Sequence, residues 1–288
     1  MPLAKTASAT RKESRLMAKL AIIAGQGALP AQIAEMASNM GHAVLIMPIE
    51  GQADADFPGF ESLPIRLGKM GATLAQMKAH GVSQMVMVGK VVRPSMTALS
   101  PDATALKLLG KAVTRGDDSL LRIIRDFFAD AGIETLAPDL FLPDRVAPSG
   151  LMAGVAPDAA IAADLALAIR ALQALGDLDV GQAAITQDGR VIAIEAAEGT
   201  NEMIRRSAAL IDPDSTSAVL VKMPKTGQDA KLDIPTIGSH TLAEASKAGI
   251  GCVAVQAGQV LFADSVEVMC EACKNGGITL LGFTDQVG

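Results

Sequence analysis

The 288-residue chain contains no tryptophan and no tyrosine, and its seven phenylalanines bring the aromatic fraction to only 2%. Proteins that hold single-stranded nucleic acid stack the bases on aromatic side chains, so this composition argues against that class. A positive charge excess is also missing, because 25 Lys and Arg stand against 31 Asp and Glu, a net charge of −6. This charge argues against binding a nucleic-acid backbone and against strong adsorption to an anionic membrane. We therefore expect no nucleic-acid partner.

Cysteine and histidine are scarce as well, with three residues of each. An odd number of cysteines does not make a disulfide framework, and we expect a cytoplasmic protein. Cys270 and Cys273 form a single C-x-x-C motif late in an expected helix, whereas redox motifs stand at a helix N-terminus. We interpret this pair as structural. The scattered histidines, His42, His80 and His240, are interpreted as surface or packing residues.

Long apolar runs are missing too, although half of the residues are hydrophobic. No stretch reaches the roughly 20 apolar residues of a membrane-spanning helix. The most apolar expected helix, 157–175, is interrupted by Asp158, Asp164 and Arg170. Residues 1–16 are basic and precede only a short apolar run, so we interpret them as a flexible leader rather than a signal peptide.

A chain of this length is expected to form two domains, of which residues 17–145 are the first. Continuous apolar runs alternate with helical segments here, which indicates a parallel sheet covered on both faces. We expect a Rossmann-like α/β domain that binds ligands at the carboxyl ends of its strands. The expected strands are 20–24, 43–48, 65–67, 84–88 and 134–137. The expected helices are 30–40, 73–79, 104–114 and 117–131.

Residues 146–156 carry proline and glycine without periodicity, and we interpret them as a linker. Residues 157–288 are then expected to form a second, catalytic α/β domain. The Asp188-Gly189 dipeptide lies between two β-like runs and predicts a hairpin. The other expected strands are 218–221, 252–256, 258–262 and 278–283. The expected helices are 157–175, 200–209, 241–248 and 263–274.

A glycine turn, Gly25-Gln26-Gly27, follows the first expected strand and leads into a helix. Such a turn lets a phosphate approach backbone N–H groups at the helix N-terminus. Pro30 stands where a dinucleotide fingerprint has its third glycine, whereas Glu50 lies about 20 residues on, at the distance of a ribose-binding acid. The turn is therefore consistent with ligand binding, a dinucleotide included, or with a plain tight turn.

Two charged clusters belong to the same domain. Lys90 and Arg93 follow the fourth expected strand, where two cations suit a phosphate or pyrophosphate, although exposed loop lysines are common. Asp117 and Asp118 begin an expected helix. They are consistent with simple capping or with a carboxylate pair that binds a divalent cation.

Two further clusters fall in the second domain. The segment from Glu195 through Glu198 and Gly199 leads from a strand end into a helix that Thr200 is expected to cap, and its acids are either site residues or solvated. The loop 222–238 follows an apolar strand and holds three Lys and two Asp, which makes it long and polar for a plain connection. Its cations would neutralise phosphates, and an aspartate would hold Mg²⁺ or orient a water. A solvated surface loop is the alternative.

The distinctive motifs occur in a fixed order, namely GQGALP, GKVVRP, RGDDSLLR, DVGQ, EGTNEMIRR and KTGQDAKLDIPTIG. This set resembles the LpxI-type UDP-2,3-diacylglucosamine pyrophosphatases of lipid A synthesis, and the resemblance extends from Leu20 to Leu281. The chain departs from the family pattern at Asn201, where the family usually has Asp, and at Lys231, where it usually has Arg. Lysine is a point charge rather than a fork, so a two-pronged phosphate contact is not expected there.

The resemblance implies a two-domain, homodimeric hydrolase that converts UDP-2,3-diacylglucosamine to UMP and 2,3-diacylglucosamine 1-phosphate (lipid X). It implies Mg²⁺, or another divalent cation such as Mn²⁺, and a water that attacks one phosphorus. Peripheral contact with the inner membrane is compatible with it. Calcineurin-like phosphoesterases perform the same step with a histidine-rich two-metal site, for which the histidines of this chain are too few and too scattered. A carboxylate-only metal site is therefore expected.

The resemblance and the clusters together assign roles to individual residues. Catalysis is assigned to Asp233, which matches the family's essential aspartate, and to Lys225 and Lys222. The candidate metal ligands are Asp233, Asp117 and Asp118. The candidate substrate-binding residues are Gly25, Gly27, Ala28, Leu29, Lys69, Lys90, Arg93, Gln182, Glu198, Gly199, Thr200, Gln228 and Thr236. Without Trp or Tyr, uracil is expected to be recognised through backbone amides and polar side chains. The alternatives are a nicotinamide-dependent oxidoreductase and a non-catalytic lipid- or nucleotide-binding protein.

Overall fold

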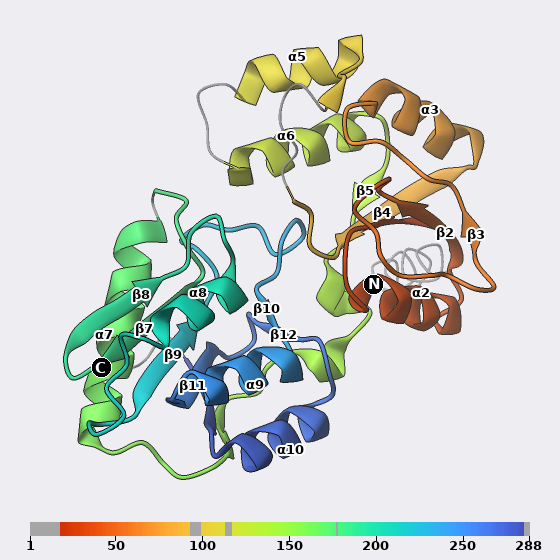
Figure 1. Cartoon of the computed structure of the whole chain (residues 1–288). Helices are drawn as coiled ribbons and strands as arrows, with labels where there is room; N and C mark the ends of the chain where they lie inside the picture. Colours follow the sequence, from red (N-terminus) through yellow and green to blue (C-terminus); the bar gives the residue numbers. More distant parts are fainter. Residues whose placement is uncertain (1–17, 93–98, 113–116, 177, 285–288) are drawn as a thin grey trace, which may run out of the picture. The chain divides into compact units, whose positions relative to one another are not determined.

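The computed structural model describes residues 18–92, 99–112, 117–176 and 178–284. The chain forms two compact units (Figure 1). The first unit takes the chain up to Leu142 together with Lys231–Asp233, and the second takes Pro143–Ala230 and the chain from Ile234 onward. A short piece of the loop 222–238 therefore belongs to a different unit from the rest of that loop.

The first unit is built on a five-stranded sheet in the order β3-β2-β1-β4-β5, in which every neighbouring pair is parallel. This arrangement confirms the expected parallel α/β fold. The expected third strand is wrong in position, since β3 is short and precedes it, and Ile65 forms only an isolated bridge to Ile49. The strands are β1 (Lys19–Ala24), β2 (Ala43–Pro48), β3 (Glu61–Ser62), β4 (Val82–Val88) and β5 (Glu134–Thr135).

Helices cover this sheet, and the continuous apolar runs of its central strands are explained by burial on both faces. Ala21 and Met85 pack on one face with Met77 of α3 and Phe128 of α6. Side chains one position along the strands, such as Ile22, are also fully buried, and α2 packs against β1 and β2. The helices are α2 (Leu29–Asn39), α3 (Met70–Ala79), α5 (Ala103–Ala112) and α6 (Asp117–Asp130), and the short 3₁₀ turn Pro138–Leu140 follows β5.

The second unit contains a six-stranded mixed sheet in the order β6-β13-β11-β9-β7-β8. Its centre is parallel, whereas β6 and β7 run antiparallel to their neighbours. A separate parallel pair joins β10 and β12, so the expected strand 258–262 is shorter and lies outside the main sheet. The strands are β6 (Gly150–Ala153), β7 (Ala183–Gln187), β8 (Arg190–Ile194), β9 (Ala218–Lys222), β10 (Thr236–Ile237), β11 (Ile250–Gln256), β12 (Leu261–Phe262) and β13 (Thr279–Phe283).

Two local predictions have different outcomes in this sheet. The hairpin is confirmed, because β7 and β8 pair antiparallel through Asp188 (φ 53°) and Gly189 (φ 70°), the two left-handed residues that a type I′ turn requires. The segment 146–156, expected as a linker, contains β6, which pairs with β13. Its proline and glycine residues therefore flank an edge strand.

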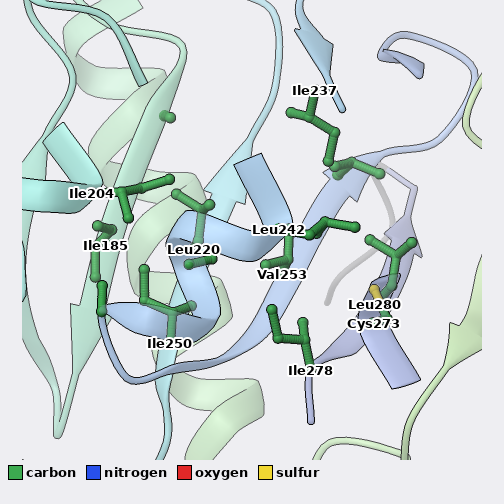
Figure 2. Close-up of a cluster of buried hydrophobic side chains, with 14 of the residues drawn as sticks. Ile185, Ile204, Leu220, Ile237, Leu242, Ile250, Val253, Cys273, Ile278 and Leu280 are labelled. Atoms are coloured by element: carbon green, nitrogen blue, oxygen red, sulfur yellow. The ribbon is translucent and has the colours of Figure 1, made fainter. Parts of the chain in front are cut away.

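Helices on both faces make the second unit a three-layer structure. Figure 2 shows one side of its core, where Leu220 and Val253 of the sheet meet Ile204 of α8 and Leu242 of α9. The opposite side chains of the same strands, such as Val219, pack against α7. The helices are α7 (Ala159–Gly176), α8 (Thr200–Ser207), α9 (Ser239–Lys247) and α10 (Val266–Gly276), and a 3₁₀ turn covers Pro143–Arg145.

Helix α7 alone among the described helices has the length and hydropathy of a membrane span, by composition only, and 28% of it is buried inside the protein. Its buried side packs on the sheet through Leu165, Ala168 and Leu172. Asp164, also buried, accepts hydrogen bonds of 2.8 Å from the backbone N–H groups of Asp188 and Gly189. A single carboxylate in this apolar helix therefore fastens the β7–β8 turn.

The C-x-x-C pair agrees with a structural interpretation. Cys270 and Cys273 both lie within α10, and Cys273 is fully buried. Burial, with a smaller contribution from Cys270, raises the pKa of the Cys273 thiol to about 12. A thiol with so high a pKa is not activated for exchange.

Candidate functional site

The carboxyl ends of β1 and β4 carry the glycine turn and the Lys90 loop, and backbone hydrogen bonds join the two. Gln26 N–H donates to Lys90 O at 2.8 Å, and Lys90 N–H donates to Gln26 O at 3.1 Å. Gly25 lies so close to the second loop that a Cβ on it would stand 2.6 Å from Lys90 O. The glycine is therefore required for close approach of two backbones.

A third loop, after β2, also reaches this edge. Asp54 accepts a hydrogen bond from Gly27 N–H at 2.7 Å. Gln52 bonds both the N–H and the carbonyl of Val92 at 3.0 Å. Gly27, Ala28 and Leu29 lie at the start of α2, as expected, but an internal carboxylate already occupies the Gly27 amide.

The structure describes only some of the other candidate residues of the first unit. Lys69 immediately precedes α3 and is half-buried, while Lys90 is exposed. Arg93 lies outside the described residues, as do the side chains of Asp117 and Asp118 at the start of α6. Phosphate binding by these cations and metal binding by these acids stay predictions.

Glu50, which stands near the position of a ribose-binding acid, accepts a hydrogen bond from Arg66 at 2.6 Å. This exposed ion pair occupies the carboxylate that a dinucleotide would need. Together with Pro30 in the first turn of α2, it weakens the dinucleotide alternative.

A polar cluster lies in the second unit, at the edge where β8 and β9 end. Lys222 is the last residue of β9, and its side chain is only 5% exposed. Its ammonium donates to the Thr200 hydroxyl at 2.5 Å and lies 3.7 Å from Glu195 Oε2. Thr200 in turn donates to Glu195 Oε1 at 2.9 Å. A buried cation, a hydroxyl and a carboxylate thus contact one another at a strand end.

The backbone before α8 places this hydroxyl. Gly199, with φ 84°, is the N-cap of α8, so the expectation that Thr200 caps the helix is wrong. Thr200 is instead the first helical residue and turns its hydroxyl toward Lys222. Glu198 accepts from Arg206 at 2.8 Å. A hydrogen bond from its own backbone N–H lowers the pKa of Glu198, and the hydrogen bond from Arg206 lowers it further.

The DVGQ motif joins the same cluster from the start of β7. Gln182 Nε2 donates to Gln228 Oε1 at 3.0 Å, and Lys225 N–H donates to the same oxygen at 2.9 Å. The Lys225 ammonium pairs with Asp179. Gly181 has φ +69°, and a Cβ on it would stand 2.5 Å from Glu195 O. The structure therefore brings together five predicted site residues, namely Gln182, Thr200, Lys222, Lys225 and Gln228.

The last motif is divided by the fold. Asp233 is exposed and belongs with Lys231 to the first unit. Thr236 begins β10 in the second unit, is half-buried, and donates to Ile234 O at 3.0 Å. The catalytic role of Asp233 stays a prediction.

Within the described part of the chain, no three His, Cys, Asp or Glu side chains gather closely enough to hold a metal ion. Mg²⁺ does not require such a set, because it keeps several waters and takes one or two carboxylates together with substrate phosphates. An exposed aspartate such as Asp233 fits that requirement.

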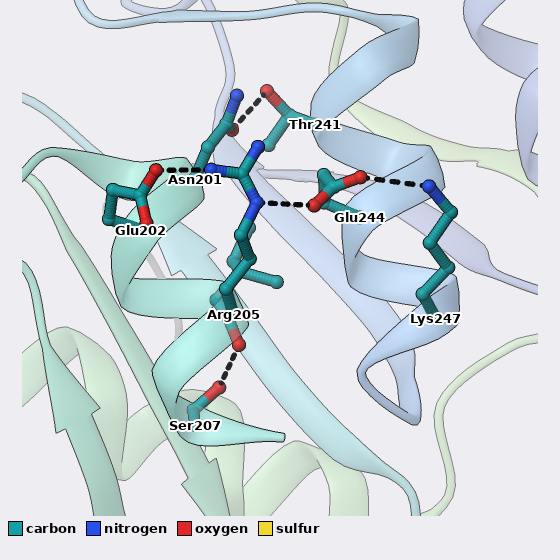
Figure 3. Close-up of polar contacts among 8 residues, drawn as sticks. Asn201, Glu202, Arg205, Ser207, Thr241, Glu244 and Lys247 are labelled. Carbon is teal, nitrogen blue, oxygen red and sulfur yellow. Dashed lines mark hydrogen bonds and ion pairs between the residues drawn. The ribbon is translucent and has the colours of Figure 1, made fainter.

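Asn201, which replaces the family's usual aspartate, takes part in a contact between α8 and α9 (Figure 3). It accepts from the Thr241 hydroxyl at 3.0 Å. Beside it, Glu244 binds Lys247 at 3.0 Å and Arg205 at 2.7 Å. Lys247 and Arg205 lower the pKa of Glu244 to about 2. In this chain the position links two helices.

The site residues selected from the sequence leave out three residues that organise these clusters. Glu195 is the last residue of an expected strand and opens the acidic cluster before the next helix, but it was weighed only as a possible site acid and given no role. Asp179 is the first residue of the DVGQ motif, from which only Gln182 was selected. Asp54 lies in a loop without any pattern, and only the tertiary contact with Gly27 reveals it.

Comparison with known proteins agrees with the motifs. Residues 19–145 match the model of the LpxI N-terminal domain, and residues 148–281 match that of the LpxI C-terminal domain. These two domains define a class of α/β proteins to which the chain as a whole corresponds.

The chain is also 34% identical over 278 residues to a Caulobacter vibrioides protein named UDP-2,3-diacylglucosamine pyrophosphatase LpxI. The similarity covers 94% of this chain and 99% of that relative. The chain belongs to the LpxI family, and the resemblance inferred from the motifs is confirmed.

Proposed function

We propose that this chain hydrolyses the pyrophosphate of UDP-2,3-diacylglucosamine in lipid A synthesis, releasing UMP and lipid X with the help of Mg²⁺ or Mn²⁺. Family membership and the name of the Caulobacter vibrioides relative support the substrate class. The structural observation that carries the proposal is the buried Lys222 ammonium at the carboxyl end of β9, held beside Thr200.

This placement suits phosphate chemistry. A cation in a water-poor environment interacts more strongly with phosphoryl oxygens than one in solvent does. Lys222 can donate to such an oxygen, and Lys225 and Gln228 belong to the same cluster. Hydrolysis requires that charge on both phosphates be offset while the bridging P–O bond breaks.

The remaining roles follow from the chemistry of each group. A bound divalent cation would supply charge neutralisation and water activation. Asp233 would hold that cation or orient the attacking water. Ala28 and Leu29 stand at the start of α2, where backbone amides would recognise a nucleotide's phosphate or uracil carbonyl. The Gly27 amide would join them once the ligand displaces Asp54.

The test is release of UMP from UDP-2,3-diacylglucosamine by the whole chain, with and without EDTA and with Mg²⁺ or Mn²⁺ added back. Asp233→Asn should abolish release while the thermal unfolding temperature stays unchanged. Asp214→Asn, a charge-matched change at an exposed position, serves as control. Full activity in Asp233→Asn would remove that residue from the mechanism.

The same assay in ¹⁸O-labelled water identifies the attacked phosphorus, because the label enters either UMP or lipid X. Tight binding of UDP-2,3-diacylglucosamine without any UMP release under excess Mg²⁺ would instead indicate a non-catalytic carrier.

The proposal includes a cytoplasmic homodimer that contacts the inner membrane peripherally. Light scattering of the purified protein checks the dimer. Co-sedimentation with vesicles of anionic lipid checks the membrane contact, and the net charge of −6 predicts that any binding is weak.

A further inference from the structure

The carboxylate of Glu195 contacts three separate groups of the cluster at the end of β9. It accepts a hydrogen bond from the Thr200 hydroxyl at 2.9 Å and another from the Gln182 backbone N–H at 3.4 Å. It also lies 3.7 Å from the Lys222 ammonium. Its side chain is only 12% exposed. The sequence suggested it only as a possible site acid at a strand end, without a specific role.

The backbone fixes Glu195 in this place. Its N–H donates to Ala183 O at 2.8 Å, which extends the β7–β8 pairing by one residue. Gly181 packs against its carbonyl, leaving no room for a side chain there. A carboxylate held so firmly can fix the direction of the hydroxyl that it accepts.

The contact between Glu195 and Lys222 is an ion pair rather than a hydrogen bond, because 3.7 Å exceeds hydrogen-bonding distance. A buried ammonium is strongly stabilised by an opposite charge nearby. Glu195 therefore balances the charge of Lys222 while leaving the ammonium able to donate to another oxygen.

This balance matters for a reaction that cleaves a diphosphate. In the substrate each phosphate of the diphosphate bears about one negative charge, whereas a released phosphomonoester bears about 1.5 to 2 at neutral pH. An unbalanced buried cation would therefore bind the products more tightly than the substrate. Binding energy of that kind slows turnover instead of accelerating it.

We propose that Glu195 is a positioning residue that orients the Thr200 hydroxyl and partly neutralises the charge of Lys222, so that the phosphate product can leave. This inference rests on the proposed function and deepens it. Glu195 acts through Lys222 and Thr200 and does not itself contact the phosphate.

The test compares Glu195→Gln with the wild-type chain in turnover and in product binding. Glu195→Gln should lower kcat on the order of 10-fold or more, since charge balance and hydroxyl orientation are both disturbed. Calorimetry should show that either UMP or lipid X binds on the order of 10-fold tighter, because the buried cation has lost its counter-charge.

Three further variants separate the two roles. Glu195→Asp keeps the charge, so its product affinity should stay near the wild-type value even though the shorter side chain lowers kcat. Thr200→Val removes the hydroxyl without changing any charge and should lower kcat without tightening product binding. Glu202→Gln, an exposed change on α8, should behave like the wild type.

A purely structural Glu195 gives a different pattern. Glu195→Gln would then lower the unfolding temperature and weaken or leave unchanged the binding of both products, and that result overturns the inference. A wild-type chain that releases no UMP would refute the proposed function. The calorimetric comparison of UMP and lipid X would still decide whether Glu195 partly neutralises the charge of Lys222.

Discussion

The carboxylate of Asp54 accepts a hydrogen bond of 2.7 Å from the backbone N–H of Gly27, at the start of α2. An N–H group at this position is where Rossmann-like proteins receive a ligand's phosphate. In this chain an internal anion holds the position and joins the loops after β1 and β2. A ligand that binds to the Gly27 amide must therefore displace Asp54.

Asp54→Ala is expected to strengthen UMP binding, because the Gly27 N–H then no longer has a competing acceptor. The gain should be several-fold and at most on the order of 10-fold, the range for one charge-assisted hydrogen bond. Isothermal calorimetry with UMP measures it. Asp56→Ala removes an equal charge from the same loop and is the control. Equal affinity in the two variants would show that UMP does not use the Gly27 amide.

Two glycine substitutions are expected to have opposite effects on stability. Gly25→Ala places a Cβ 2.6 Å from Lys90 O and should destabilise the fold by about 1–3 kcal/mol, because backbone cannot move aside cheaply. Gly110→Ala, inside α5 with open space around it, should stabilise by about 0.5–1 kcal/mol. Urea unfolding of both variants checks the pair, and a neutral Gly25→Ala would contradict the close approach of the two loops.

Asp164→Ala is expected to destabilise the second unit by about 1–3 kcal/mol, because two backbone N–H groups of the hairpin turn lose their acceptor. Asp164→Asn retains one acceptor oxygen and should cost less. Denaturant unfolding measures both. Arg170→Ala, on the exposed side of α7, is the control and should stay within about 0.5 kcal/mol of the wild type.

The cluster of Glu244, Lys247 and Arg205 predicts a specific acid sensitivity. The folded-state pKa of Glu244 is about 2, below its ordinary value of 4.5. The folded state therefore binds fewer protons than the unfolded state between these values. The stabilisation that Glu244 contributes is fully present above about pH 4.5 and is lost as the pH falls toward about 2.

Unfolding of wild type and Glu244→Gln should be compared at several pH values between 2 and 6. The stability difference between them should be largest above about pH 4.5 and should shrink on acidification. Glu35→Gln, an exposed change on α2, should follow the wild type throughout. A pH-independent difference for Glu244→Gln would show that its ion pairs do not lower the carboxyl pKa.

Much of the local structure could be predicted because it depends on short-range chemistry. The apolar runs at β1, β2 and β4 are buried on both faces, which is what a continuous run indicates. The Asp188-Gly189 turn has the backbone conformation that its residues favour. The short strand β3 and the edge strand β6 were misplaced or missed, because their pairing depends on neighbouring strands more than on their own residues.

The candidate site divides in the same way. Gln182, Lys222 and Gln228 could be selected from the sequence as polar residues in distinctive motifs at strand ends. Thr200 was selected too, but its hydroxyl meets Lys222 instead of capping α8. Gly199 caps α8 because it adopts a positive φ, and the Thr200 hydroxyl meets Lys222 because β9 ends beside it. A local sequence pattern specifies neither of these features.

The sequence by itself determined the two α/β segments, the order of the motifs and, through those motifs, the family. Hydrophobic periodicity and turn chemistry act over a few residues, so they can be read directly from the chain. Only the tertiary structure decided that Glu195 lies against Lys222 and that Asp54 occupies the Gly27 amide. These contacts join residues 27 positions apart in the chain, because parallel and antiparallel strands bring distant strand ends to one edge.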